Sequence, residues 1–324
     1  MENVTINDIN TMIRIAKKYY EVGLSQEQIS IEEDISKSTV SRILDRAEKL
    51  GYIMHKVIYP VKSMALQEEL IKRFFDIEHI FVSPLMVDNK AICMMDTCKM
   101  VVEDLNRHVC DNDIISISWG RTIEQLAELL VPPATPKKGV KVVQLNGSIA
   151  TSILSTKTAS ILQKFTEVYS GVGYMIAAPA LVDSKDIAKA IKSDTRIKMV
   201  LELAAEANIA VFSIGQISEN SVLIERGSIT LKDVDVLRTV GAVGDICTRY
   251  FDIEGNLVNN EYNARTIGIE LTGLKKKKLR IGIAVGTEKA DAIIGALRGG
   301  YMTSLYMDEK TAASVLKRCK ELGL

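Results

Sequence analysis

The hydrophobic positions of the chain follow two patterns, one before and one after about residue 60. In residues 7–50, apolar side chains recur every three or four positions, which is the spacing of amphipathic helices. From residue 77 onward, short β-branched runs alternate with helical stretches, which indicates a mostly parallel sheet covered by helices. We therefore predict two domains, a small helical one over residues 1–58 and a larger doubly wound α/β domain over residues 59–324.

Three short helices are predicted in the first domain. Ser25 and Gln28 form a capping-box pattern at the start of the second helix, and Ser36 is placed to cap the third. Gly51 ends the third helix as a left-handed C-cap would. The stretch "YIMHKVIYP", residues 52–60, favours a short β arm, so the domain is expected to be a helix-turn-helix of the winged type.

The second domain is expected to alternate strands and helices. A helix is predicted first, over 64–75. Strands are predicted over residues 80–84, 114–119, 141–145, 209–214, 280–285 and 303–308. Helical patterns cover most of the intervals, over 89–109, 122–130, 155–168, 185–207 and 288–298.

Composition removes several classes of function. The 324 residues carry 41 basic and 41 acidic side chains, so any contact with nucleic acid must come from a local patch. Aromatic residues are 5% of the chain, which disfavours a stacking platform for single strands. The five cysteines are scattered without a zinc-ligand spacing, so we expect reduced thiols in a cytoplasmic protein, with neither metal nor cofactor. No apolar run approaches the roughly 20 residues of a membrane span, and the polar N-terminus is not a secretory signal.

The third predicted helix, within "SKSTVSRILDRAEKLGY" (residues 36–52), has two unlike faces. Its apolar positions are Val40, Ile43, Leu44, Ala47 and Leu50. Hydroxyl and basic residues crowd its start and its opposite side, which suits a helix that enters the major groove of DNA. The candidate DNA-binding residues are Lys37, Ser38, Thr39, Ser41, Arg42 and Arg46. An ordinary amphipathic surface helix is the alternative interpretation.

Glycine stands in or just after four of the predicted strands, at Gly120, Gly147, Gly215 and Gly286. Ligands of open parallel sheets bind outside the carboxyl ends of the strands, where glycine lets backbone N–H groups and a helix N-terminus approach an anion. Arg121, Thr122 and Lys289 follow two of these glycines and are candidates for a phosphate site. Asp245, Gln144 and Asn146 are candidate partners for sugar hydroxyl groups, although Gln144 could instead pair with the backbone.

The stretch "GLSQEQISIEEDISKSTVSRILDRAEKLGYI" resembles the N-terminal helix-turn-helix of the SorC family of bacterial transcriptional regulators, whose relatives include deoxyribonucleoside regulators. Ser30, Ile31 and Glu33 depart from the usual pattern of the second helix. The segments "SISWGRTI", "VVQLNG", "GAVGDICTRYFDIEGN" and "AVGTEKADAIIGALRGG" are similar, in order, to the motifs of that family's effector domain. The resemblance implies a sugar-phosphate-binding domain on a tetrameric repressor or activator.

These observations lead to one expectation and two alternatives. We expect a homo-oligomeric repressor that binds operator DNA and responds to a phosphorylated sugar. The glycine turns would also suit a sugar-phosphate isomerase or deaminase, but no histidine falls in a predicted strand-end turn to act as a base. The other alternative is a DNA-binding protein whose large domain is an assembly scaffold without a ligand.

Overall fold

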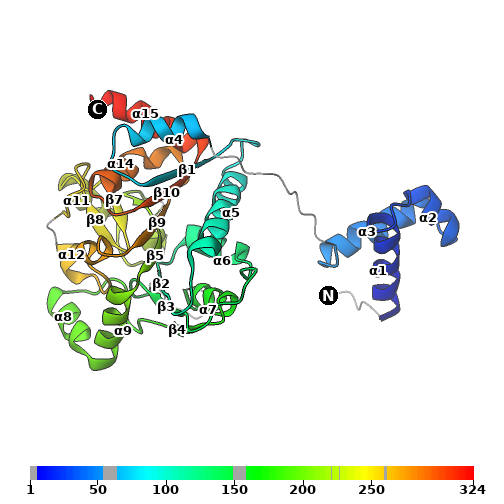
Figure 1. Cartoon of the computed structure of the whole chain (residues 1–324), viewed down its shortest axis with the longest axis horizontal. Helices are drawn as coiled ribbons and strands as arrows, with labels where there is room; N and C mark the ends of the chain where they lie inside the picture. The colour runs from blue at the N-terminus through cyan, green and yellow to red at the C-terminus, as the bar shows by residue number, and fades with distance from the viewer. Residues whose placement is uncertain (1–5, 54–63, 149–157, 220, 226, 259–260) are drawn as a thin grey trace. The chain divides into compact units, whose positions relative to one another are not determined.

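The computed structural model describes residues 6–53, 64–148, 158–219, 221–225, 227–258 and 261–324 (Figure 1). The chain divides into two compact units, Met1–Pro60 and Val61–Leu324. The predicted domain boundary at residue 58 and most of the predicted β arm lie outside the described residues, so both stay predictions.

The first unit consists of α1 (Ile6–Tyr20), α2 (Gln26–Glu32) and α3 (Lys37–Lys49). Ser25 and Gln28 form the predicted capping box at the start of α2, and the Ser36 side chain accepts the Thr39 N–H at the start of α3. The three helices share a small core that includes Ile15, Ile29, Val40 and Leu44. Side-chain caps at the helix starts and the packing of the apolar helix faces against one another therefore explain why these residues form a three-helix unit.

Three details of the first unit differ from a simple amphipathic pattern. The apolar pattern predicts Leu50 on the buried face, but it is 45% exposed because α3 ends at Lys49. Glu33 pairs with Arg14 at 2.9 Å and with Lys18 at 2.8 Å, so ion pairs join the end of α2 to α1. Ile31 is the apolar member of the three residues that depart from the family's usual second helix. It is 77% exposed and takes no part in the core.

The second unit is built on a parallel sheet of seven strands in the order β1-β10-β9-β5-β2-β3-β4. The strands are β1 (His79–Ser83), β2 (Ile114–Ile117), β3 (Lys141–Gln144), β4 (Val172–Tyr174), β5 (Ile209–Ser213), β9 (Leu279–Ile283) and β10 (Ser304–Asp308). All six predicted strands are present, and β4 was not predicted. The α/β class with a parallel sheet is confirmed.

Helices cover both faces of this sheet (Figure 1). On one face, α5 (Lys90–His108), α6 (Arg121–Leu129) and α7 (Thr158–Val168) pack over alternate strand residues such as Ile209 and Val211. On the other face, α4 (Ala65–Lys72), α14 (Ala290–Arg298) and α15 (Glu309–Glu321) pack over Ala210 and Phe212. Burial on both faces explains why the strands are almost uniformly apolar.

Other elements surround this core. The predicted helix 185–207 is two helices, α8 (Lys185–Ser193) and α9 (Thr195–Glu206), because Asp194 ends the first and caps the second. An antiparallel sheet, absent from the prediction, comprises β6 (Gly215–Gln216), β7 (Gly244–Ile246) and β8 (Arg249–Phe251). The short helices are α10 (Val222–Glu225), α11 (Leu231–Thr239), α12 (Glu261–Arg265), α13 (Leu271–Leu274) and the 3₁₀ turn η2 (Thr287–Lys289).

The strand order changes direction between β2 and β5. From β2 the chain proceeds to β3 on one side, whereas from β5 it proceeds to β9 on the other. The connections that leave these two neighbouring strands therefore diverge, and a crevice opens at their carboxyl ends. The residues that follow β2, β5 and β9 meet at this place.

Candidate functional site

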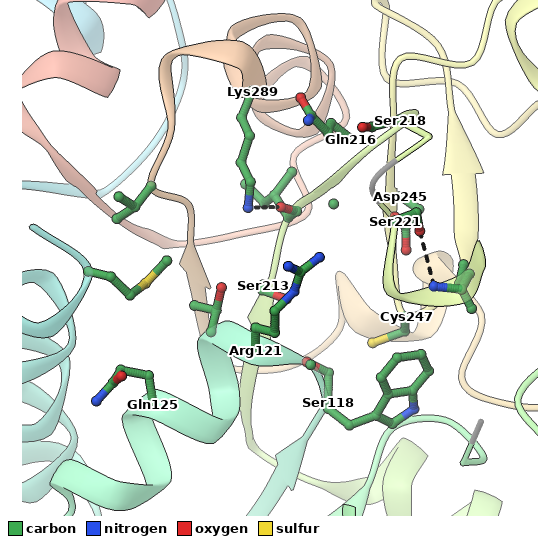
Figure 2. Close-up of a pocket in the computed structure, with 18 of the residues that line it drawn as sticks. Ser118, Arg121, Gln125, Ser213, Gln216, Ser218, Ser221, Asp245, Cys247 and Lys289 are labelled. Carbon is green, nitrogen blue, oxygen red and sulfur yellow. Dashed lines mark hydrogen bonds between the residues drawn. The ribbon is translucent and has the colours of Figure 1, made fainter. Parts of the chain in front are cut away.

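A pocket of about 890 Å³ opens at the carboxyl ends of β2, β5 and β9 (Figure 2). Six of the eight predicted effector-binding residues line it, namely Gly120, Arg121, Thr122, Asn146, Asp245 and Lys289. The pocket thus brings together residues that lie far apart in the sequence, such as Arg121 and Lys289.

Gln144 and Gly147 are not among the residues that line the pocket. The buried Gln144 side chain accepts the backbone N–H of Ile176 at 2.9 Å, which is the backbone pairing left open as the alternative. The carbonyl of Gly147 accepts the indole N–H of Trp119 at 2.6 Å. Because Trp119 does line the pocket, Gly147 contacts the site through that ring.

Two glycine turns form the cationic wall. Gly120 and Gly286 have φ angles of 128° and 133°, a region that side chains rarely adopt, and each precedes a helical turn. Arg121 is the first residue of α6, and Lys289 ends the 3₁₀ turn before α14. Both side chains extend toward the pocket (Figure 2). These turns combine N-terminal helix ends with positive side chains, an arrangement that attracts anions.

The Lys289 ammonium donates to the carbonyl of Ile214 at 2.9 Å. Burial and, to a smaller extent, the nearby charge of Lys90 lower the pKa of Lys289 to about 8, against the opposing effects of Glu288 and Asp245. The lysine is therefore mostly protonated at neutral pH and loses its charge just above it.

Lys90 and Glu288 form an ion pair at the pocket that the sequence did not suggest. The Lys90 Nζ and Glu288 Oε1 atoms are 2.5 Å apart, and both residues line the pocket. The Glu288 carboxylate lies directly over Gly286, where a Cβ atom would be 2.5 Å from Oε1. Burial raises the pKa of Glu288, but hydrogen bonds from Lys90 and from its own backbone N–H outweigh this effect and lower it. A carboxylate of the protein thus lies against one of the glycine turns.

Asp245 is on the opposite wall. The short strand β6 continues directly from β5 and pairs with β7, which places Gly215 opposite Asp245. The Asp245 Oδ1 atom lies so close to Gly215 that a side chain there would collide with it. Burial raises the pKa of Asp245 to about 6, although the Thr248 N–H donates to its Oδ2 at 3.1 Å. Asp245 is therefore a buried acceptor for hydroxyl groups at neutral pH.

Polar side chains fill the rest of this wall. Asn146 donates to the Thr248 hydroxyl at 3.1 Å, while its buried Oδ1 has no partner among the described residues. The Ser118 hydroxyl is also buried without a partner there. Buried polar atoms of this kind favour a ligand that supplies hydrogen bonds. Further polar lining comes from the end of β5, at Ser213, and from the segment after it, at Gln216, Ser218 and Ser221.

The pocket therefore has a cationic wall and a wall of carboxylate, amide and hydroxyl groups. This arrangement can bind a polyhydroxylated molecule that carries an anionic group. Neither histidine that the structure describes lines it: His79 begins β1 and His108 ends α5. His55 lies outside the described residues. Among the described residues there is no cluster of three or more potential metal ligands.

The candidate DNA-binding residues all lie on α3. Lys37, Ser38 and Arg42 are exposed, while Thr39, Ser41 and Arg46 are half-buried. The Ser36 hydroxyl is 2.8 Å from those of both Ser38 and Thr39, so these two residues also belong to the helix cap. The Arg42 Nε donates to the Ser38 carbonyl at 3.3 Å, which holds the guanidinium at the helix start.

A helical unit with a polar helix face, joined to a domain with a sheet-edge pocket, is the organisation of a ligand-responsive regulator. Residues 59–317 match the Sugar-bind family, whose description is a sugar-binding domain. Over 306 residues, the chain is 34% identical to the deoxyribonucleoside regulator of Bacillus subtilis (strain 168), covering 94% of this chain and 96% of that protein.

A second relative has a solved structure. The chain is 28% identical over 326 residues to the sorbitol operon regulator of Klebsiella pneumoniae, covering 98% and 100% of the two proteins. The crystal structure of full-length SorC from that organism superposes with a TM-score of 0.71, 26% identity, and coverage of 96% and 99%. The chain belongs to the SorC family of bacterial transcriptional regulators.

This membership decides between a regulator and an enzyme. The similar proteins are named as transcriptional regulators, so the chain is a regulator and not an enzyme. Among the residues that the structure describes, no helix combines the length and the apolar character that a membrane span requires.

Proposed function

We propose that this regulator is a repressor whose DNA affinity is controlled by a phosphorylated sugar bound in the 890 Å³ pocket. The observation that carries the proposal is the opposition of Arg121 and Lys289 to Asp245 across one pocket (Figure 2). Paired cations at helix N-termini suit a phosphate, and a buried carboxylate with nearby amide and hydroxyl groups suits sugar hydroxyls. The names of two relatives, which concern deoxyribonucleosides and a sorbitol operon, support a carbohydrate or nucleoside catabolic operon.

The proposed DNA contact is the winged helix-turn-helix of residues 1–58. In this proposal α2 and α3 are its two short helices, and the exposed face of α3 enters the major groove. Arg42 would contact a guanine edge, while Lys37 and the hydroxyls of Ser38, Thr39 and Ser41 would contact bases or phosphates. Arg46, one turn further along, would contact the backbone. The chain carries no net charge, so this face must supply the attraction locally.

A homodimer or homotetramer completes the proposal. Operators with two half-sites require two recognition helices, which a symmetric oligomer supplies. The effector would bind one quaternary arrangement better than the other and so change operator affinity. Light scattering with and without effector would measure the oligomeric state directly.

A thermal-shift screen tests the effector. Binding to the folded state alone raises the unfolding midpoint, and a ligand at about 100 times its Kd adds about 2.7 kcal/mol of stability. We expect pentose or hexose phosphates to raise the midpoint and the matching unphosphorylated sugars to have a much smaller effect. If no compound of a broad panel shifts it, a scaffold without a ligand becomes the better account.

A further inference from the structure

A second, smaller pocket lies behind Asp245 and adjoins the large one. Its volume is about 10 Å³, close to the space that one water-sized group requires. Five residues line both pockets, namely Gln216, Ser218, Ser221, Leu223 and Asp245. The small pocket is thus continuous with the polar wall of the large one. Its deeper lining is apolar except for Tyr250.

Tyr250 lines the small pocket, and its hydroxyl group is not used in the protein's own hydrogen bonds among the described residues. The residue is 2% exposed, and its hydroxyl has no hydrogen-bond partner among the described residues. Its position is fixed, because Asn263 Oδ1 accepts its backbone N–H at 2.9 Å and its ring packs edge-on against Tyr262 at 6.2 Å. A buried hydroxyl without a partner is destabilising, so a group that pairs with it would be favoured.

The residues around the small pocket indicate which kind of group would pair with the Tyr250 hydroxyl. Burial and the neighbouring Asp245 raise the pKa of Tyr250 well above its ordinary value, so the hydroxyl stays protonated and can both donate and accept. Asp245 supplies an acceptor on the same wall. The apolar residues Ile229, Val234 and Leu237 close the far side and exclude anything larger or charged.

We infer that the small pocket is a subsite for a single hydroxyl oxygen, held between Tyr250 and Asp245. A water molecule meets this description when no effector is bound. If the proposed function is correct, a hydroxyl group of the sugar takes the same place, and the subsite then distinguishes a sugar from its deoxy analogue. Tyr250 is in this account a specificity-determining residue of the pocket.

Stability measurements test the subsite without any effector. Tyr250→Phe removes only the hydroxyl oxygen. The matched control is Tyr169→Phe, because Tyr169 is also fully buried and its hydroxyl donates to Asn106 Oδ1 at 2.9 Å. In urea unfolding of the full chain, we expect both variants to lower the midpoint. An equal or higher midpoint for Tyr250→Phe alone would mean that its hydroxyl was unpaired, and the inference would be wrong.

Calorimetry then identifies the source of the oxygen. Ribose 5-phosphate, glucose 6-phosphate and their 2-deoxy analogues are titrated into the wild type and into Tyr250→Phe. If a sugar hydroxyl fills the subsite, the variant loses about tenfold in affinity for the hydroxylated member of a pair and little for the deoxy member. An equal change for both members, with a lowered urea midpoint, assigns the subsite to water. If no compound of the broad thermal-shift panel binds the wild type either, the proposed function fails, while the urea result still decides the subsite.

Discussion

Lys289 makes the proposed anion site sensitive to pH in a defined direction. Burial lowers the pKa of this lysine to about 8, so its charge is present below that pH and is lost as the pH rises through it. A phosphate dianion binds the charged form. We expect the Kd of the effector to rise about tenfold between pH 7.5 and 9.5, measured by calorimetry.

Two variants isolate this effect. Lys289→Gln should bind the effector weakly at every pH in this range and lose the pH dependence. Lys317→Gln removes an exposed lysine of α15 that pairs with Glu321 and should keep the wild-type profile. A steep loss of affinity above pH 8 in Lys289→Gln would assign the titration to another group.

Glu288 acts in the opposite sense, because its carboxylate lies on the glycine turn that is proposed to receive the phosphate. Replacing it with glutamine keeps the size of the side chain and removes the negative charge. We expect Glu288→Gln to bind the sugar phosphate about three- to tenfold more tightly, because one repulsion is removed and Lys90 is released to pair with the ligand.

The matched control is Asp291→Asn in the first turn of α14, since Asp291 pairs with Arg318 and does not line the pocket. Its affinity should match that of the wild type. Weaker binding by Glu288→Gln would show instead that the ion pair with Lys90 holds the turn in its binding conformation.

At the scale of elements, the proposed base contact of helix α3 depends mainly on the guanidinium of Arg42. Arg42 is exposed, and its Nε hydrogen bond to the Ser38 carbonyl points it along the helix start. We expect Arg42→Ala to weaken operator binding by about 1–3 kcal/mol and to relax specificity at one base pair, measured by fluorescence anisotropy.

The comparison variant is Arg196→Ala, which removes an exposed arginine from α9 of the other unit. It should leave operator binding unchanged. A uniform loss of affinity for all DNA sequences in Arg42→Ala would make this residue a phosphate contact and would move base recognition to other residues of α3.

Elements were predictable where local sequence decides them. Capping serines placed α2 and α3, and continuous apolar runs placed six strands of the large sheet to within about two residues. Strands β4, β6, β7 and β8 were missed because two or three residues, often glycine, carry too little pattern. The two helices within 185–207 were merged because one capping residue, Asp194, separates two apolar stripes.

The pocket was predictable mainly where glycine marks a strand end. Arg121 and Lys289 were found in this way, and Asp245 through its buried turn. Lys90 and Glu288 are 198 positions apart, and no local signal connects them. Gln216 and Ser221 reach the pocket because β6 follows β5 closely, and β6 becomes evident only once β7 has been placed beside it.

At the scale of the whole molecule, the proposal requires a coupling free energy between operator and effector, and such a coupling is reciprocal. If the sugar phosphate weakens operator binding by a given factor, saturating operator must weaken effector binding by the same factor. For a repressor we expect this factor to lie between about 5 and 150, equivalent to about 1–3 kcal/mol. Anisotropy titrations of DNA from upstream of the neighbouring genes would give the first factor, and calorimetry with and without that DNA would give the second.

Variants in each unit make this test specific. Lys289→Gln should keep operator affinity and lose the response to effector. Arg42→Ala should keep effector affinity and bind the operator more weakly, by the same margin of about 1–3 kcal/mol. Because each variant changes one binding event, neither should alter the oligomeric state seen by light scattering. Unequal factors in the wild type would mean that a third equilibrium, such as a change of oligomeric state, takes up part of the binding energy. A factor of one would leave the pocket without influence on DNA and would refute allosteric control by this ligand.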